Sequence, residues 1–271
     1  MRKEAKKLIK VTNTKVAGFE PAIRGMRNPM NSWDKSDTIF VTPDGQYHDI
    51  HGNFGPFCGH ECLFLYGWVE PVIGKNDLQL MQKLYKAGSE HRKYLRHIMV
   101  WMDILAPLYW WKEFDTYKVG TTADSCSTMH KIHAKEFTLD DFSHGHLFKD
   151  NYEQYDEGEN DCCLDSDETG FGFLDYETES DRYVFPKETL GFTIDILNRC
   201  REVYLKTKNK EVWWQMIQLL PSSYNQMRTV SMNYEVVMRM IDQRKDHKLD
   251  EWREFTDILS ELPYVKLIRG E

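Results

Sequence analysis

The spacing of apolar residues predicts short strands early in the chain and long helices late in it. Apolar side chains cluster at positions 8–11 and 38–41, which favours two short strands in an otherwise irregular stretch from 1 to 60. From 77 to 87 the apolar positions recur at helical spacing, and Gly88 is suited to end that helix. The first third of the chain is therefore expected to combine strands with one helix.

The middle of the chain passes from apolar to strongly acidic. Residues 97–104 mix aliphatic and aromatic side chains, which is typical of a buried strand. Pro107 then precedes an aromatic run from 108 to 114, and proline suits the first turn of a helix. Residues 143–182 lack such a period and are rich in Asp and Glu, so we interpret them as an acidic surface insertion.

Helical spacing dominates the C-terminal half. The pattern predicts helices at 186–206, at 211–220, from just after Ser223 through Arg244, and at 249–262, where Pro263 stops the last one. No internal repeat and no linker rich in proline, glycine or serine divides the sequence. We therefore expect an α+β fold in a single domain, residues 1–271, with a largely helical C-terminal half.

Composition narrows the class of protein. The chain has 271 residues, of which 41% are hydrophobic and 13% aromatic, enough for a substantial core. A formal net charge of -8 argues against nonspecific binding to a nucleic-acid polymer, although a few cations in one cleft can still hold a small anion. No apolar run is long enough for a membrane span, no secretory signal is recognisable, and six cysteines lack a framework spacing. We expect a cytoplasmic protein with reduced thiols.

An amide and a guanidinium in the C-terminal part are the first candidate site. Asn233 and Arg244 are eleven residues apart, about three helical turns, so a helix through both would place them near one face. Such a pair suits a planar, anionic ligand such as a nucleotide.

Three other groups of residues could either bind a ligand or have only a structural role. His48, His51, Cys58, His60 and Cys62 fit zinc in residue type, but their spacing is no zinc signature, so we expect no metal. His91 and His97 flank a run of cations, which forms either a solvated helix face or an anion pocket.

The third constellation is a group of hydroxyl side chains between 112 and 128. Backbone N–H groups and hydroxyls at such a helix-to-loop transition can hold phosphate oxygens, although clusters of Ser and Thr are common in loops. Cys126, within this stretch, has His130 and His133 nearby as possible bases, but no third group supports a nucleophile there.

Two ungapped blocks of the sequence resemble the flavin-dependent thymidylate synthases. In the C-terminal block the family has Leu-Pro, an Asn twelve residues on and an Arg eleven beyond that, which Leu220-Pro221, Asn233 and Arg244 match. Trp252 matches part of the family's Ala-Gln-Trp segment.

The second block runs from 90 to about 128. It keeps both histidines of a family motif, as His91 and His97, and the Ala-Pro start of the next helix. The other motif positions are Lys112-Glu113-Phe114 for Arg-Gln-Trp, Thr116-Tyr117-Lys118 for the signature Arg-His-Arg, and Cys126, beside Ser127, for the signature Ser. The family has Arg where this chain has Thr128, Ile217 and Glu235, and His or Asn where it has Arg239.

The resemblance implies a mixed or antiparallel sheet and an enzyme that converts dUMP to dTMP with FAD, NADPH and methylenetetrahydrofolate. It implies catalytic roles for Arg244 and His91. It implies FAD contacts by Tyr117, Lys118, Thr121, Asn233 and Arg239, and contacts to a dUMP-like nucleotide by Glu113, Asp124, Cys126, Ser127 and Arg244. In such enzymes the flavin carries the hydride.

The resemblance also implies a homotetramer that shares sites between subunits. Two alternatives stay open because of the changed motif positions. One is a flavoenzyme of the same fold that modifies another pyrimidine nucleotide, for instance by hydroxymethylation. The other is a non-catalytic binding or assembly protein that keeps only the fold.

Overall fold

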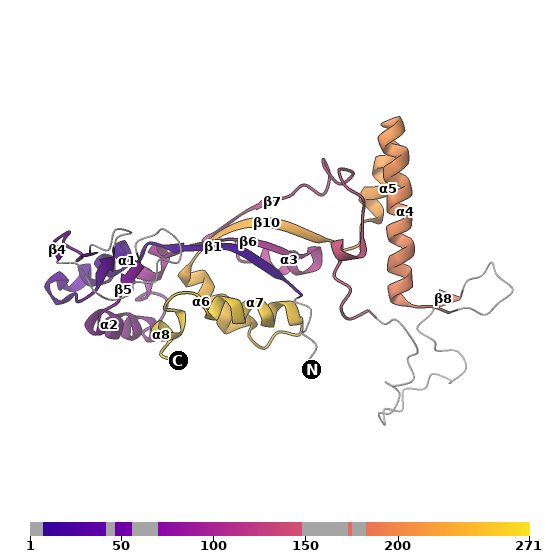
Figure 1. Ribbon diagram of the computed structural model, residues 1–271. Helices are drawn as coiled ribbons and strands as arrows, with labels where there is room; N and C mark the ends of the chain where they lie inside the picture. Colours follow the sequence, from indigo (N-terminus) through magenta and orange to yellow (C-terminus); the bar gives the residue numbers. More distant parts are fainter. Residues whose placement is uncertain (1–7, 42–46, 56–69, 148–172, 175–182) are drawn as a thin grey trace, which may run out of the picture. The chain divides into compact units, whose positions relative to one another are not determined.

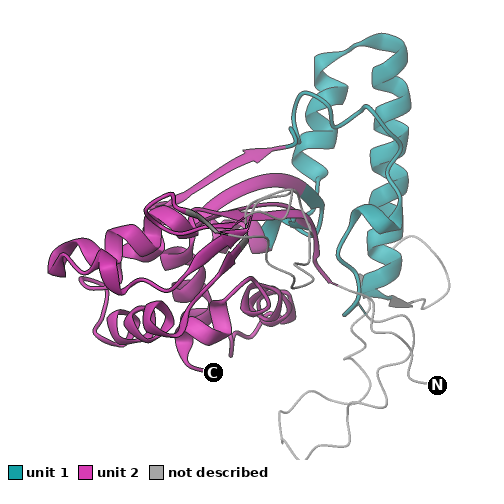
Figure 2. Cartoon of the chain, turned by 60° about the vertical axis from the view of Figure 1, so that its left-hand side comes forward, with its two compact units in different colours: residues 1–6, 106–109, 126–226 teal, residues 7–105, 110–125, 227–271 magenta. Residues whose placement is uncertain are grey.

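The computed structural model describes residues 8–41, 47–55, 70–147, 173–174 and 183–271, and these form an α+β fold with antiparallel sheets (Figure 1). The chain divides into two compact units, each considered by itself (Figure 2). The first unit includes residues 106–109 and 126–226, and the second spans 7–105, 110–125 and 227–271. The α+β class and the helical C-terminal half are confirmed, whereas the single domain stays a prediction.

A four-stranded sheet, most of it in the second unit, carries the core of that unit. Its strands, in spatial order, are β1 (Lys10–Ala17), β6 (Met99–Pro107), β10 (Asn225–Asn233) and β7 (Thr121–Ser125). β1 runs antiparallel to β6, and β10 runs antiparallel to β7. In β6 every second side chain from 100 to 106 is buried, so one face of the sheet turns toward a core.

The helices of the same unit pack on one another, and α6 and α7 lie below the sheet in the view of Figure 1. The helices are α1 (Phe19–Arg27), α2 (Lys75–Lys86), α6 (Tyr234–Arg244), α7 (Asp250–Ser260) and α8 (Val265–Arg269). Next to them, α3 (Leu108–Phe114) ends in an aromatic cluster in which Trp110 lies 4.7 Å from Trp252 and 5.2 Å from Phe255, measured between ring centroids. All three rings are fully buried, which explains why the aromatic run at 108–114 forms a core helix.

A second small sheet and a buried ion pair complete this unit. The sheet order is β4 (Phe54–Gly55), β3 (Tyr47–His48), β2 (Ile39–Val41) and β5 (Glu70–Val72). Asp77 of α2 binds the Arg27 guanidinium at 2.7 Å, and both side chains are almost completely buried. The same carboxylate accepts hydrogen bonds from the hydroxyls of Ser36 and Thr38. This network ties α1, α2 and the segment before β2 together.

The first unit is built on a helical hairpin. α4 (Pro186–Thr207) and α5 (Lys210–Leu219) are joined through Lys208, which has a positive φ of 55°, and Asn209 caps α5 by accepting a hydrogen bond from the Glu211 N–H. The strands β8 (Phe173–Leu174) and β9 (Tyr183–Val184) pair before α4. The unit has its own hydrophobic core, formed by Ile132, Phe137, Phe142, Leu190, Ile194, Leu197 and Met216.

The structure corrects the expected helix between Ser223 and Arg244. Its first part is the strand β10, and only Tyr234–Arg244 is helical. Val230 and Met232 are buried while Thr229 is exposed, a period of two that belongs to a strand lying inside the sheet. Asn233 and Arg244 therefore lie at the two ends of α6, Asn233 as its N-cap and Arg244 as its last residue.

Two further helices were not foreseen. α1 lies within the stretch expected to be irregular, although Phe19, Ala22, Ile23 and Met26 are buried at helical spacing. α8 follows Pro263, where the last helix was expected to stop. The acidic insertion at 143–182 falls mostly outside the described residues.

Candidate functional site

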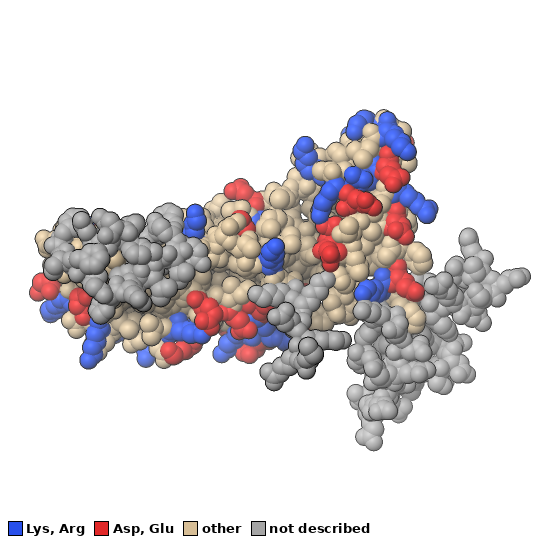
Figure 3. Space-filling view, viewed as in Figure 1, with Lys and Arg blue, Asp and Glu red and all other residues tan. Residues whose placement is uncertain are grey.

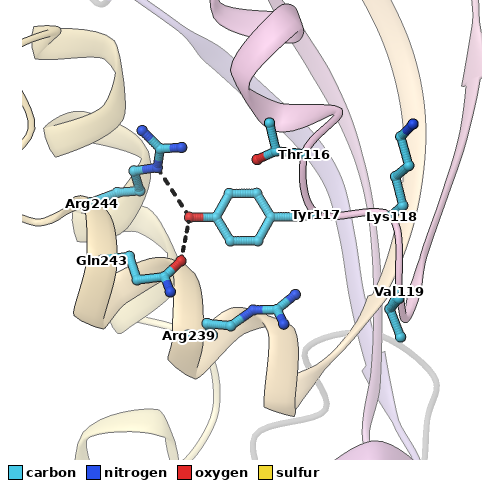
Figure 4. A pocket seen from close by; sticks show the side chains of 7 residues that line it. All are labelled: Thr116, Tyr117, Lys118, Val119, Arg239, Gln243 and Arg244. Atoms are coloured by element: carbon cyan, nitrogen blue, oxygen red, sulfur yellow. Dashed lines mark hydrogen bonds between the residues drawn. The ribbon is translucent and has the colours of Figure 1, made fainter.

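A pocket of about 290 Å³ opens in the second unit between the end of α3 and helix α6 (Figure 4). Tyr117 lies in its centre, with Arg244 and Gln243 toward one end and Lys118 toward the other. Its lining residues are Thr116, Tyr117, Lys118, Val119, Arg239, Gln243 and Arg244. Four of them, Tyr117, Lys118, Arg239 and Arg244, were proposed from the sequence as site residues.

The turn before β7 docks closely on the start of α6. Gly120 has a positive φ of 84°, and a Cβ there would lie 2.6 Å from Nδ2 of Asn233, so only glycine fits without strain. The Asn233 N–H donates to the Gly120 carbonyl at 3.2 Å, and the Asn233 side chain accepts from the Val236 N–H at 3.1 Å. Asn233 is thus the N-cap of α6 and fixes this helix against the wall that carries Tyr117.

Tyr117 orients the end of α6 through two hydrogen bonds. Its hydroxyl accepts from Nε of Arg244 at 3.0 Å and donates to Oε1 of Gln243 at 3.0 Å (Figure 4). Tyr117 is only 4% exposed, so the surrounding residues hold its hydroxyl in one position. The Arg244 guanidinium also lies 4.9 Å from the centroid of the Trp252 ring, an arrangement that holds it by a cation–π contact.

A carboxylate stands directly beside Arg244. Nη1 of Arg244 donates to Oε2 of Glu113 at 2.6 Å, and Nε2 of His247 lies 3.1 Å from the same oxygen. The ion pair is partly exposed, with 20% of the Arg244 and 37% of the Glu113 side chain accessible. Glu113 therefore balances much of the charge of Arg244, and the guanidinium is held in a defined orientation.

Two cations of the pocket lack such a carboxylate. The Arg239 guanidinium lies 5.4 Å from the centroid of the Tyr117 ring, and its Nε is buried without a hydrogen-bond partner among the described residues. Lys118 is exposed and forms no ion pair within the part of the chain that the structure describes. An unsatisfied buried N–H and two uncompensated charges at one pocket favour an anionic ligand.

Other cations of this unit are engaged away from the pocket. Nε of Arg92 lies 3.0 Å from the carboxylate of Glu235. Glu235 stands where the family that the sequence resembles has an arginine. Arg228 pairs with Asp115 at 2.8 Å and lies 4.3 Å from the Trp111 ring centroid. Their charges are therefore largely compensated by their neighbours.

The remaining residues proposed from the sequence do not line this pocket. Thr121 is the first residue of β7, and its hydroxyl donates a hydrogen bond to the Tyr117 carbonyl. Thr121 therefore holds the backbone of Tyr117 in place. Asp124 is exposed on β7 opposite Thr229, and His91 is exposed in a turn after Gly88. Their roles toward a ligand stay predictions.

Cys126 and Ser127 belong to the first unit. Cys126 is an exposed free thiol, and the Ser127 hydroxyl accepts from the N–H groups of Met129 and His130. That hydroxyl therefore caps a local turn.

The structure added residues that the sequence had not singled out. Gln243, Thr116 and Val119 line the pocket, and His247 contacts Glu113. Gln243 follows Arg239 by four residues, so helical spacing alone places both on one side of α6.

The described residues contain neither a metal-binding cluster of His, Cys, Asp and Glu nor a helix long and apolar enough to cross a membrane. His48 stacks on Phe40 with the ring centroids 5.4 Å apart. Cys58, His60 and Cys62 lie outside the described residues, as do the cysteines at 162 and 163.

Comparison with known proteins gives a match at the level of structure only. No protein-family model matches the sequence, and no curated protein matches it either. A crystal structure of the flavin-dependent thymidylate synthase ThyX from Helicobacter pylori, complexed with FAD and dUMP, is 13% identical and has a TM-score of 0.56. The match covers 96% of this chain and 98% of the other.

A second structure of Helicobacter pylori ThyX with FAD and dUMP is 15% identical, with a TM-score of 0.56 and 97% coverage of both chains. Such similarity over nearly the whole length is a statement about architecture, because so low an identity carries no residue roles with it. It agrees with the resemblance seen in the two sequence blocks. The chain therefore has, in divergent form, the fold of the flavin-dependent thymidylate synthases.

Proposed function

We propose that this chain is an FAD-dependent enzyme of the thymidylate synthase type that methylates dUMP reductively, with methylenetetrahydrofolate and NADPH as co-substrates. The observation that carries the proposal is the cationic pocket on α6. It lies in a fold whose similar structures were determined with FAD and dUMP. A pocket of about 290 Å³ is at the lower end of the usual range for ligand sites, so it suits a mononucleotide or one half of a dinucleotide.

The residues of the pocket fit an anionic flavin cofactor. Arg239 has a buried Nε that is unsatisfied among the described residues, and Lys118 adds a second charge, so both would bind phosphate oxygens of FAD. Tyr117 and Thr121 would shape the wall. Asn233 would contribute mainly by holding α6 in place, since its side-chain oxygen already caps the helix. When bound, FAD would supply hydride transfer.

Arg244 is the residue that we assign to the nucleotide substrate. A guanidinium has five N–H donors, and the described contacts use one at Nε and one at Nη1, so the others are available for a pyrimidine edge or a phosphate. Glu113 would orient Arg244 and contact the substrate with its second oxygen. Asp124 would add to the substrate contacts. Cys126 and Ser127, which belong to the first unit, are assigned to the substrate by the resemblance alone.

His91 is the residue that would need a partner subunit. It is exposed and is not among the lining residues of the pocket, so its proposed catalytic role requires contact with a site on another chain. This is consistent with a homotetramer that shares sites between subunits, which we include in the proposal.

Spectroscopy of the purified full-length chain tests the proposal. We expect the protein to keep a visible flavin spectrum after FAD is added and the free cofactor is removed by gel filtration. With methylenetetrahydrofolate present, we expect NADPH oxidation that dUMP accelerates and dTMP detected by mass spectrometry. Arg239→Gln should lose most FAD binding, whereas Arg253→Gln, an exposed arginine of α7, should keep it. A chain that is colourless after removal of free FAD and binds no dUMP refutes the proposal.

A second candidate function has a specific observation in its favour. Glu113 stands beside Arg244 where the resembling family has glutamine, which changes the hydrogen bonds offered to a pyrimidine. The enzyme would then modify another pyrimidine nucleotide, for instance by hydroxymethylation. A thermal-shift comparison of pyrimidine monophosphates separates the two, because a clear preference for dUMP counts against this alternative.

A third candidate is a binding protein without catalysis. The Arg92–Glu235 pair favours it, because an arginine position of the family has become a compensated ion pair. FAD binding together with nucleotide-stimulated NADPH oxidation would eliminate it.

A further inference from the structure

The side of α4 that packs on the core of the first unit changes character near the end of the helix. Leu190, Ile194 and Leu197 are almost completely buried in that core. One and two turns further on, the same side carries Arg201 and Tyr204 in place of aliphatic side chains. A helix side that faces its own domain is normally apolar, so a guanidinium at this place is unusual for a residue with only a structural role.

Two further basic side chains lie against the ring of Tyr204. The imidazole ring of His133 lies 4.8 Å from the Tyr204 ring, measured between centroids, in an edge-to-face arrangement. Nζ of Lys208 lies 5.4 Å from the centroid of the same ring. Arg201 connects α4 to the segment of His133, because its Nε donates to the His133 carbonyl at 3.1 Å. We call this group the Tyr204 cluster, and its members are Lys131, His133, Arg201, Tyr204 and Lys208.

The positive charges of the Tyr204 cluster are not compensated within the described residues. Arg201 uses only its Nε, and the two terminal nitrogens of its guanidinium have no hydrogen-bond partner in that part of the chain. Lys131 and Lys208 form no ion pair there either. By contrast Lys135, the next lysine along the chain, is paired with Asp141. The missing counter-charge is therefore a property of this cluster and not of every cation in the segment.

The ring of His133 responds to this excess of positive charge. Its Nδ1 is buried and has no hydrogen-bond partner among the described residues. Partial burial and the charges of Lys208, Lys131 and Arg201 together lower the pKa of the ring below its ordinary value. The carboxylates that flank the cluster in the sequence form no ion pair with any described residue, and these are Glu136, Glu202 and Glu211. Like charges held together without a counter-ion favour the binding of an anion.

We propose that the Tyr204 cluster is an anion site that binds a phosphate group, either free or carried by a small molecule. Three cations around His133 suit a dianion, and a phosphate group carries a charge near -2 at neutral pH. The two terminal nitrogens of Arg201 form a planar fork that can donate to two phosphate oxygens at once. The ammonium groups of Lys131 and Lys208 add two point charges on flexible stems.

The site is open to solvent and is separate from the pocket on α6. Figure 3 shows Lys and Arg gathered at the end of the hairpin where α4 passes into α5. Lys131 and Lys208 are exposed and Arg201 is half-buried, so a ligand can reach the cluster. The other cations near this end of α4, Arg199 and Lys206, lie on the opposite side of the helix. The cluster contains none of the residues proposed to bind FAD or dUMP, so the inference is independent of the proposed function.

A local spectroscopic signal tests the site in the full-length chain. The ring signal of His133 is followed by NMR after isotope labelling of histidine and is assigned from its loss in His133→Gln. Inorganic phosphate should shift this signal with half-saturation at about 1 mM or below, whereas sodium chloride at the same ionic strength should not. Arg201→Gln and Lys208→Gln should each raise the half-saturation concentration at least about 5-fold. Arg199→Gln and Lys206→Gln are the matched controls and should change it less than about 2-fold.

Glycerol 3-phosphate distinguishes the two sources of the phosphate group. If it binds at least as tightly as inorganic phosphate, the natural ligand is a phosphorylated small molecule, and if it binds more weakly, the ligand is free phosphate. Circular dichroism checks that the variants fold. Lys208→Gln removes no hydrogen bond of the described chain, so it stays informative even where Arg201→Gln disturbs the contact with the His133 carbonyl.

Three results would overturn the proposal, whatever the outcome of FAD binding. The first is a His133 signal that does not respond to about 20 mM phosphate. The second is equal weakening by Lys206→Gln and Lys208→Gln, which would indicate a general attraction to the basic end of the hairpin. The third is a single-stranded oligonucleotide that binds more tightly than both probes and depends on Arg199 as much as on Arg201, which would assign this surface to a nucleic-acid polymer.

Discussion

Replacing Glu113 by glutamine separates two roles of the carboxylate beside Arg244. Oε2 of Glu113 holds Nη1 of Arg244 at 2.6 Å and lies 3.1 Å from His247. Glutamine keeps an oxygen acceptor for both partners and removes the negative charge. If Glu113 mainly opposes an anion on Arg244, Glu113→Gln will bind nucleotides more tightly.

The magnitude follows from the distances and the exposure of the pair. An anion bound to Arg244 would lie about 4 Å from the Glu113 carboxylate, where two unit charges interact by about 1 kcal/mol in water and about 4 kcal/mol at an effective dielectric constant of 20. Because 37% of the Glu113 side chain is exposed, the value near that of water applies. For a phosphate of charge near -2 we expect a gain of about 1–2 kcal/mol, or about 5- to 30-fold in affinity.

Isothermal titration calorimetry with dUMP measures this change, and inorganic phosphate gives the contribution of charge alone. Asp115→Asn is the matched control, since Asp115 is 50% exposed, pairs with Arg228 and does not line the pocket. It should change the dissociation constant less than about 2-fold, and 1 M salt should remove most of the gain of Glu113→Gln. Weaker binding by Glu113→Gln would refute the argument and would assign Glu113 to holding Arg244 in place.

Three further predictions concern stability. Asp77→Asn leaves Arg27 buried without its counter-charge, so urea unfolding should give a loss of about 3–5 kcal/mol, and a loss below about 1 would contradict the buried pair. Burial raises the pKa of Asp77, but hydrogen bonds from neighbouring hydroxyls and Arg27 outweigh it, so the net pKa lies below that of an ordinary carboxyl. The stability from Asp77 is therefore complete above about pH 4 and declines as pH falls through the lowered pKa, which circular dichroism during acid titration should detect in wild type and much less in Asp77→Asn. Gly120→Ala should cost about 2–3 kcal/mol, because it strains a positive φ and displaces the Asn233 cap, whereas Gly191→Ala, in open space on α4, should be neutral or stabilise by up to about 1 kcal/mol.

The sequence predicted those elements whose pattern is local. The period of apolar residues in α2, α4 and α5 and the aromatic run of α3 gave these helices to within a few residues. The prediction of a helix was wrong at 225–233, where Val230 and Met232 are buried at a period of two. The helix that follows was extended back to the preceding proline. A strand inside a sheet depends on partners such as β7, which are distant in sequence, so a local pattern cannot establish it alone.

The candidate site was predicted in part, for a similar reason. Tyr117, Lys118, Arg239 and Arg244 follow from motif positions and do line one pocket. The Glu113–Arg244 pair joins residues 131 positions apart. The sequence around either residue does not show that the other one neutralises its charge. Helical spacing from Arg239 could have predicted Gln243 as a pocket residue. Pairs between side chains distant in sequence could be identified only in the folded chain.

The two ends of the pocket differ in charge, because some of its cations are paired with carboxylates and others are not. Arg92 and Arg228 are neutralised by Glu235 and Asp115. At the pocket itself, Arg244 is balanced by Glu113, whereas Arg239 and Lys118 have no carboxylate partner among the described residues. The end of the pocket at Lys118 is therefore the more positive one, and the phosphate groups of the cofactor should bind there. The end at Arg244, with donors on the guanidinium and an acceptor on Glu113, is left for the nucleotide substrate. This division requires that losing Lys118 weakens FAD binding more than dUMP binding, and that losing Arg244 has the opposite effect.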